Sequence, residues 1–285
     1  MSGDFLYFAA FGVLTILVFQ VAAVLFDALL RRVNFADAIV AKRNGAAGIE
    51  QAGRAIGAFM IAASVVKGCV GGVDVLHDVA WTAAFGFPAV VLLVVVGRLS
   101  AQVLLRARIA GEIARNNTAA GIAVAAHDVA TAIVIARCLH GNSVDTLGVS
   151  LAFLAIALVT LNLFIVAFRV ITTYADSEEV LDNNVAAALS YAGITVALGI
   201  IIAHAAEGDF VSWEKSLGAY GLALAFAAAL YPVRQVIVEA VILRAGFSLR
   251  GGRLDREIAE QRNIGVGAVE AAAYVGVALF VVSVA

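Results

Sequence analysis

One stretch, Asn117-Thr-Ala-Ala-Gly-Ile122, decides the fold because it recurs in three other places along the chain. The other copies are Asn44-Gly-Ala-Ala-Gly-Ile49, Asn184-Val-Ala-Ala-Ala-Leu189 and Asn263-Ile-Gly-Val-Gly-Ala268. An asparagine before a helix can accept hydrogen bonds from N–H groups of the first turn, which have no partner within the helix. We therefore predict four equivalent helices whose N-caps are Asn44, Asn117, Asn184 and Asn263.

A glycine follows each of the first three copies at one constant distance, at Gly68, Gly141 and Gly208. The distance from asparagine to glycine corresponds to ~36 Å of helix at ~1.5 Å per residue, which is one membrane crossing. Glycine readily adopts the left-handed conformation that ends many helices. We therefore predict that these glycines are C-caps.

The composition indicates a membrane protein. Of 285 residues, 63% are apolar and 14% are charged, against roughly 45–50% and 25% in an ordinary soluble domain. The apolar residues come in blocks of about 20 or more, the length needed to cross a bilayer core of ~30 Å. The predicted spans are Phe5–Leu30, Gly45–Val66, Val79–Leu105, Thr118–Leu139, Leu147–Phe168, Val185–Ala205, Ser216–Leu243 and Ile264–Ala285.

These spans form pairs, and the second member of each pair begins with a cap asparagine. We predict an all-α, polytopic transmembrane helical bundle of about eight helices, built from four two-helix parallel repeats. The two halves also repeat each other, which gives two four-helix repeat domains, 1–142 and 143–285. Such an arrangement is compatible with a pore, a closed bundle or a covalent fusion of a former dimer.

The even-numbered spans are rich in alanine and glycine, whereas the odd-numbered spans carry more valine, leucine and phenylalanine. Small residues let helix backbones approach closely in lipid, where no hydrophobic effect drives helices together. We therefore predict that the even-numbered helices lie inside the bundle and that the odd-numbered helices face lipid.

Basic residues indicate the orientation of the chain. The loops after the odd-numbered spans hold Arg31, Arg32, Lys42, Arg43, Arg106, Arg108, Arg115, Arg169, Arg244, Arg250, Arg253, Arg256 and Arg262. The opposite loops and span ends hold only Lys67, Arg137 and Lys215. Cytoplasmic loops carry an excess of lysine and arginine in membrane proteins. We therefore predict that the odd loops are cytoplasmic and that both termini are periplasmic, on the extracytoplasmic side.

The run Asn116-Asn-Thr-Ala-Ala-Gly121, repeated more loosely at Asn44–Gly48 and Asn183–Ala188, resembles the signature of the YjfL-like bacterial inner-membrane family, classified as domain of unknown function 350. Members are typically half this length, so the chain resembles a tandem duplication of that domain. The resemblance implies a bacterial inner (plasma) membrane location, no established enzymatic activity, and an association with envelope-stress genes that include phage-shock-type membrane-binding proteins and ATP-grasp ligases. The fourth copy, at Asn263, departs from the pattern.

Ionisable residues within the spans concentrate in the even-numbered ones, at Glu50, Arg54, His127, Asp128 and Glu270. Such groups cost ~2.5–3.5 kcal/mol each on insertion scales and usually face a bundle interior or an aqueous cavity. Glu50 and Arg54 are four residues apart with the acid first, which favours an ion pair on one helix. Asp128 has no opposite charge three or four residues away, so it must be protonated, water-exposed or paired across helices.

Two functions compete for this set of residues. The first is a structural or envelope-stress-linked membrane component without enzymatic activity, in which buried charges hold helices together. The alternative is a proton or cation pathway, with His127 and Asp128 as the relay and Glu50 and Glu270 as flanking acids. A metal site from these four residues is chemically allowed, but no pair has the spacing that metal ligands share on one helix face, so none is predicted.

Other functional classes leave no trace in the sequence. There is no nucleophile elbow, zinc-binding His pair, phosphate-binding loop or dinucleotide fingerprint, so we expect neither an enzyme nor a cofactor. A net charge of −2 gives no basic footprint for nucleic acid. The expected partner is the lipid bilayer, and further copies of the chain and envelope-stress membrane proteins are candidate partners. Asp78 is expected at the outer surface, and Arg234 and Glu239 are expected to reach the cytoplasmic interface. Cys69 and Cys138 are expected to be idle thiols.

Overall fold

The computed structural model describes residues 3–31, 35–72, 74–139, 144–207, 212–246, 248 and 250–284, and no strand occurs within these ranges. Eight helices in the described part of the chain are long and apolar enough to cross a membrane, so the predicted polytopic helical bundle is confirmed. These helices are α1 (Gly3–Arg31), α2 (Gly45–Cys69), α3 (Val75–Leu105), α5 (Thr118–Cys138), α6 (Val144–Ile171), α8 (Val185–Ala205), α9 (Trp213–Gln235) and α11 (Ile264–Val284).

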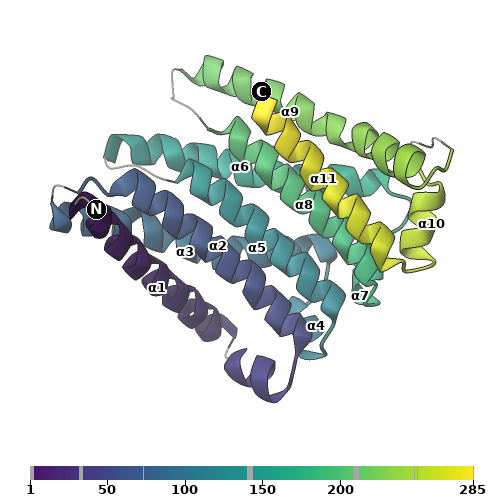
Figure 1. The fold of residues 1–285 in the computed structure, drawn as a ribbon, viewed down its shortest axis with the longest axis horizontal. Helices are drawn as coiled ribbons and strands as arrows, with labels where there is room; N and C mark the ends of the chain where they lie inside the picture. The colour runs from purple at the N-terminus through teal and green to yellow at the C-terminus, as the bar shows by residue number, and fades with distance from the viewer. Residues whose placement is uncertain are drawn as a thin grey trace.

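Shorter segments precede each of the helices that begin with a cap asparagine. They are η1 (Asp37–Ala41), α4 (Ile109–Ala114), α7 (Asp176–Leu181) and α10 (Arg253–Ala259), and a π-helical segment, η2 (Val236–Ile242), extends α9. Each repeat therefore consists of a long helix, a short helical segment and a capped helix. Figure 1 shows α4, α7 and α10 together at one end of the bundle.

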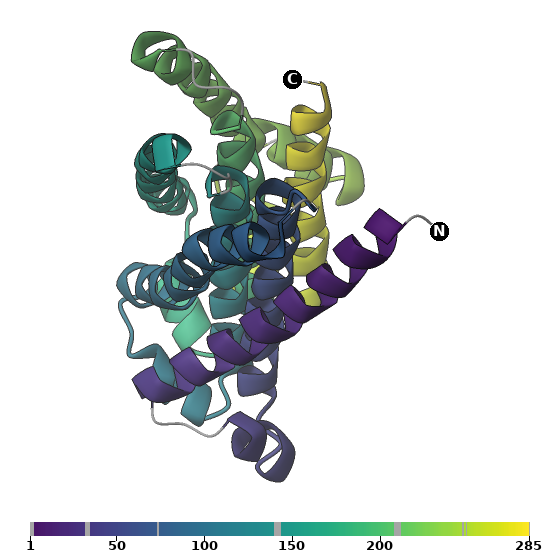
Figure 2. The same cartoon turned by 90° about the vertical axis from the view of Figure 1, so that its left-hand side faces the viewer.

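The capped helices α2, α5, α8 and α11 pack side by side in chain order and form a central row (Figure 1). The other long helices lie against this row: α3 packs on α2 and α5, α6 packs on α5 and α8, and α9 packs on α8 and α11. Figure 2 shows α1 inclined to the capped helices as it crosses the first end of the row. The repeats are thus arranged as a row with two ends.

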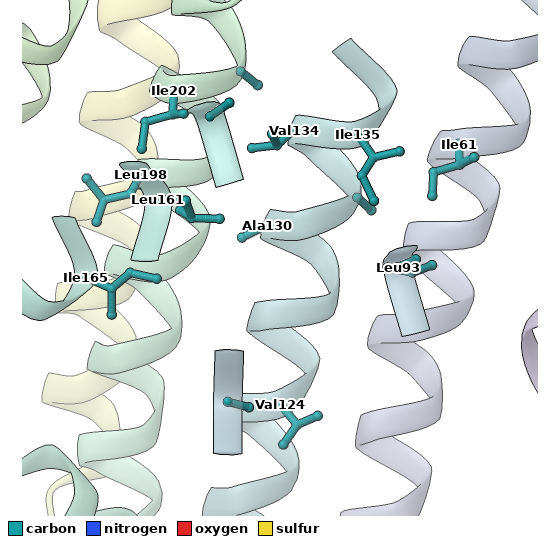
Figure 3. Close-up of a cluster of buried hydrophobic side chains, with 14 of the residues drawn as sticks. Ile61, Leu93, Val124, Ala130, Val134, Ile135, Leu161, Ile165, Leu198 and Ile202 are labelled. Atoms are coloured by element: carbon teal, nitrogen blue, oxygen red, sulfur yellow. The ribbon is translucent and has the colours of Figure 1, made fainter. Parts of the chain in front are cut away.

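Burial follows position in this row. The predicted inside position is confirmed for α5 and α8, whose most apolar windows are 78% and 72% buried. It does not hold for α11, whose window is 28% buried, the same share as the odd-numbered helix α6. The physical reason is that α11 ends the row and has a capped helix on one side only. Figure 3 shows Leu161 and Ile165 of α6 packed near Leu198 of α8 in the core.

Glycine allows the capped helices to approach one another closely. A Cβ atom on Gly53 of α2 would lie 2.5 Å from the Cα atom of Ala125 on α5. In the same way, a Cβ atom on Gly193 of α8 would lie 2.4 Å from the Cα atom of Ala271 on α11. Real Cβ atoms do not come this close, so larger residues would force the backbones apart.

The predicted C-cap at Gly68 is wrong. Helix α2 continues past Gly68, and its C-cap is Val70, which has an extended backbone with φ −93°. The turn is stabilised instead by Asp78, whose carboxylate accepts hydrogen bonds from the N–H groups of Gly71 and Gly72 at 2.8 and 2.9 Å. Asp78 is therefore buried and does not lie at the surface as expected. Two further predicted caps lie outside the described residues: Gly141 and Gly208.

Candidate functional site

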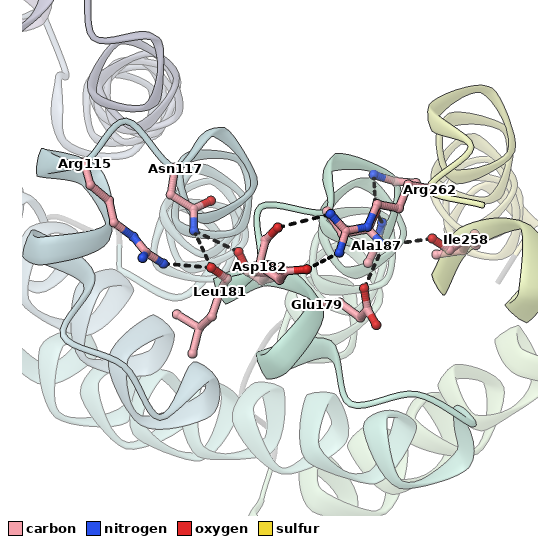
Figure 4. A network of polar contacts seen from close by, with 11 residues as sticks. Arg115, Asn117, Glu179, Leu181, Asp182, Ala187, Ile258 and Arg262 are labelled. Carbon is pink, nitrogen blue, oxygen red and sulfur yellow. Dashed lines mark hydrogen bonds and ion pairs between the residues drawn. The ribbon is translucent and has the colours of Figure 1, made fainter. Parts of the chain in front are cut away.

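The cap asparagines join neighbouring repeats at the end of the bundle that holds the short helices. Asn117 Oδ1 accepts a hydrogen bond from the N–H of Ala120 at 2.9 Å, which caps α5. Its Nδ2 donates to the carbonyl of Val180 at 3.0 Å, in the short helix of the next repeat (Figure 4). Asn44 and Asn184 make the equivalent cross-repeat bonds, and their acceptors are the carbonyls of Ile113 and Ile258.

The residue before each cap asparagine has a left-handed backbone. These residues are Arg43, Asn116, Asn183 and Arg262, with φ between 50° and 64°. Asn116 Oδ1 accepts a hydrogen bond from the N–H of Ala46 at 3.1 Å, and Asn183 Oδ1 accepts one from the N–H of Ala119 at the same distance. Each of these junctions is therefore tied in both directions. Helix-capping rules do not predict that the residue before the cap accepts a hydrogen bond from the neighbouring repeat, because this contact depends on which repeats lie side by side.

Arg54 on α2 lies at the centre of a buried ion cluster. Its guanidinium is 2.5 Å from Asp27 Oδ2 on α1, 3.1 Å from Glu50 Oε1 on α2 and 3.1 Å from Asp128 Oδ2 on α5. All four side chains are at most 1% exposed. The predicted Glu50–Arg54 pair is present, and Asp128 is paired across helices. The contribution of Asp27 was not predicted, because nothing local relates α1 to α2.

A second buried cluster lies at the other end of the row. Arg234 on α9 is 3.2 Å from Glu270 on α11 and donates a hydrogen bond of 2.5 Å to the Tyr274 hydroxyl. Gln235 contacts both Arg234 and Glu239, and the backbone N–H of Arg253 donates to Glu239 at 2.9 Å. The expectation that Arg234 and Glu239 reach the interface is wrong, since each is 1% exposed.

His127 contacts a different helix from its neighbour Asp128. His127 Nε2 lies 2.7 Å from the hydroxyl of Tyr191 on α8, whereas Asp128 contacts Arg54 on α2. Adjacent residues on a helix point about 100° apart, since each turn holds 3.6 residues. The five predicted pathway residues therefore occupy three places: Glu50, Arg54 and Asp128 lie together, while His127 and Glu270 lie apart.

Arg169 connects the middle of the row to the short helix α7. Its guanidinium is 3.4 Å from Asp176, donates to the carbonyl of Leu104 and lies 5.7 Å from the centre of the Tyr191 ring. Burial raises the pKa of Asp176 to about 7, although the charge of Arg169 favours the ionised form. The Asp176 carboxyl can therefore change its charge near neutral pH.

Two cavities among the described residues lie away from the Arg54 cluster. The larger one has a volume of about 320 Å³ and is lined by Thr173, Tyr174, Gly251, Gly252, Asp255, Arg256, Ala259 and Glu260. A small cavity of about 10 Å³ lies beside Arg169, Tyr191 and Tyr274. Within the described ranges, no group of three or more His, Cys, Asp or Glu residues is placed to hold a metal ion.

Comparisons with known proteins identify the family. The family described as Domain of Unknown Function (DUF350) matches residues 1–139 and again residues 142–285. No curated protein and no solved structure matches the chain. The two matches together cover nearly the whole sequence, and each contains two of the four capped helices. The chain therefore belongs to the DUF350 family and carries the DUF350 domain twice in tandem.

Proposed function

We propose that the chain is a structural component of a bacterial inner membrane, without enzymatic activity, that works with envelope-stress membrane proteins. The observation that carries this proposal is the contact of Arg54 with Asp27, Glu50 and Asp128 on three helices. Buried charges in a bundle are costly unless they are paired. Their sealed pairing supports a role in holding α1, α2 and α5 in a fixed arrangement.

The depth of the buried charges also supports this role. Glu50 and Arg54 lie six and ten residues past their cap, Asp128 lies eleven past its cap, and Glu270 lies seven past its cap. At ~1.5 Å per residue, these positions fall in one layer ~8 Å thick. A proton or cation pathway needs polar or ionisable groups at successive depths along the ~30 Å of the bilayer core. A layer in the membrane plane suits helix association better than transport.

Measurement of ion and proton flux in liposomes tests the proposal against the pathway alternative. We expect the purified chain to give no flux above empty liposomes under pH, sodium or potassium gradients. Asp128→Asn should leave this result unchanged and should lower thermal stability, because it weakens the contact with Arg54. Flux through the wild-type chain that falls sharply in a folded Asp128→Asn variant would overturn the structural proposal.

The orientation is proposed from the basic loops, with both termini on the extracytoplasmic side. Reporter fusions after Ala285 and between Arg250 and Arg253 test it independently. We expect extracytoplasmic reporter activity from the first fusion and cytoplasmic activity from the second. Cytoplasmic activity from the C-terminal fusion would contradict the proposed orientation but would leave the helix arrangement intact.

A further inference from the structure

The interfaces between capped helices repeat in one register. Gly53 of α2 meets Ala125 of α5, and Gly193 of α8 meets Ala271 of α11. In both pairs, the first residue lies nine positions past its cap asparagine and the second lies eight positions past its own cap. The α2–α5 and α8–α11 interfaces are therefore equivalent at this level.

The same register holds nearer the other end of the helices. A Cβ atom on Gly57 of α2 would lie 3.0 Å from Ala132 of α5, and one on Gly199 of α8 would lie 3.0 Å from Ala130 of α5. Gly57 and Ala130 both lie thirteen positions past their caps, and Ala132 and Gly199 both lie fifteen positions past theirs. The three interfaces thus share one geometry, in which each capped helix has a front face and a back face.

The last helix of the row leaves its front face open. The front-face positions of α11 are Gly265, Ala272 and Gly276, which lie two, nine and thirteen residues past Asn263. All three are exposed, and a Cβ atom on Gly276 would meet nothing within 4 Å. The equivalent positions inside the row are buried against the next capped helix, as Gly53 and Gly57 show.

The first helix of the row leaves its back face open. Gly48 of α2 occupies the register of Gly121 and Gly267, whose Cβ positions lie 2.7 and 2.4 Å from the preceding capped helix. A Cβ atom on Gly48 itself would meet nothing within 4 Å, and Ala52, one turn further, is exposed. Helix α1 does not cover this face, because it contacts α2 on the side of Arg54.

The two ends of the row also carry complementary hydrogen-bonding groups, a donor in the last repeat and an acceptor in the first. Three cap asparagines donate to a carbonyl in the next repeat, but Asn263 donates to its own Glu257 at 3.0 Å and is exposed. The carbonyl-bearing residues Ile113 and Val180 lie four positions before their caps and are 5% and 0% exposed. The first repeat has Val40 at this position, and it is 76% exposed. The donor of such a junction, Asn263, is therefore exposed at one end of the row, and the residue that carries the acceptor, Val40, is exposed at the other end.

Charges at the two ends are also complementary. Inside the row, Arg262 forms an ion pair with Asp182, which lies two residues after the buried Val180. In the last repeat, the residue two positions after the buried Ile258 is the exposed Glu260. In the first repeat, Arg43 precedes the cap as Arg262 does, has the same left-handed backbone and is exposed.

We infer that copies of this chain associate head to tail, with the front face of α11 from one copy against the back face of α2 from the next. The model for this contact is the α5–α8 interface, in which Ala126 also lies nine positions past its cap and is buried. In this register, Ala272 packs on Ala52, Asn263 donates to the carbonyl of Val40, and Arg43 pairs with Glu260. Phe59 then faces Gly276, whose missing side chain leaves room for the ring. A head-to-tail interface is heterologous, so it produces a ring or an open chain of copies in the membrane plane. This inference rests on the proposed structural role, to which it adds an assembly of identical copies.

Cysteine cross-linking in native membranes tests this interface. In a background with Cys69→Ala and Cys138→Ala, the variant Ala52→Cys/Ala272→Cys should form a ladder of disulfide-linked oligomers, because residues eight and nine positions past their caps face each other across the internal interfaces. Each single variant should lose every band above the dimer. The matched control is Leu14→Cys/Leu222→Cys, which places thiols at exposed positions of α1 and α9 outside the register. A ladder of equal intensity from this control, or no ladder from the Ala52/Ala272 pair, overturns the interface.

Charge reversal supplies an independent test with the folded chain in mild detergent. Arg43→Glu and Glu260→Arg should each shift the native mass from oligomer to monomer, and the combined variant should recover the oligomer. A wild-type chain that is monomeric at all concentrations, or no rescue in the combined variant, overturns the proposal. Neither result depends on flux in liposomes. A chain that is monomeric and gives no flux would contradict the assembly but not the structural role. Flux through a chain that still forms the disulfide ladder would contradict the structural role but not the assembly.

Discussion

Asp128 Oδ2 on α5 lies 3.1 Å from Arg54 Nη2 on α2, and both side chains are sealed from solvent. This contact joins the first two capped helices near the middle of their length, ten and eleven residues past their cap asparagines. Asp27 reaches the same guanidinium from α1, so one arginine connects three helices. The cluster is therefore a determinant of helix arrangement in the first half of the chain.

Replacement of the central arginine should be strongly destabilising. Arg54→Met leaves Asp27, Glu50 and Asp128 close together in a buried site, and loss of one partner from a buried pair costs about 3–5 kcal/mol. Unfolding of the purified chain in detergent measures the change. Arg137→Met is the matched control, because Arg137 pairs with Glu207 at the surface and such pairs contribute about 0–1 kcal/mol. Equal losses in the two variants would contradict the role of Arg54.

The cap asparagines should differ in their contribution to stability. Asn117→Ala removes the cap of α5 and the bond to Val180, and both bonds are buried. We expect a loss of about 1–3 kcal/mol in the free energy of unfolding. Asn263→Ala removes a weak cap, whose bond to the N–H of Val266 is 3.3 Å long, and an exposed bond to Glu257, and should cost about 0.5 kcal/mol. Both variants are measured at low protein concentration in detergent, so that the free energy of unfolding refers to single copies of the chain.

Close approach between α2 and α5 should not tolerate a larger side chain. Gly53→Ala places a Cβ atom 2.5 Å from the Cα atom of Ala125, which forces the helices apart and should cost about 1–3 kcal/mol. Gly221→Ala on α9 is the control, because its Cβ atom would meet nothing within 4 Å. The control should be neutral or slightly stabilising, since alanine favours a helix over glycine. A Gly53→Ala variant as stable as the control would contradict the close packing.

Stability should depend on pH through Asp176. Its pKa rises from 3.8 to about 7 on burial, so the folded chain binds this proton more tightly than the unfolded chain does. The contribution is fully present below pH 3.8 and is lost as the pH rises through about 7, because the ionised carboxylate is then buried. Melting temperatures in detergent between pH 5 and pH 8 should fall with rising pH in the wild type. Asp176→Asn should flatten this dependence, and an unchanged slope would contradict it.

Local patterns determined much of the structure from sequence. The eight spans, the cap asparagines and the Glu50–Arg54 pair all depend on spacing within one segment, where helix geometry fixes which groups can meet. The failures also have local causes. Gly68 did not end α2, because Asp78 from the next helix already binds the N–H groups of the turn.

The sequence by itself determined that this chain has eight helices long and apolar enough to cross a membrane and that a cap asparagine recurs before four of them, because apolar length and a repeated cap are properties of single helices. Only the tertiary structure decided that these units stand in a row, that Asp27 and Asp128 share Arg54, and that Arg234 is buried beside Glu270. Each of these depends on which helices lie side by side and on how they are rotated. Several partner choices can satisfy the same buried charge, and close packing of glycine against alanine favours one of them.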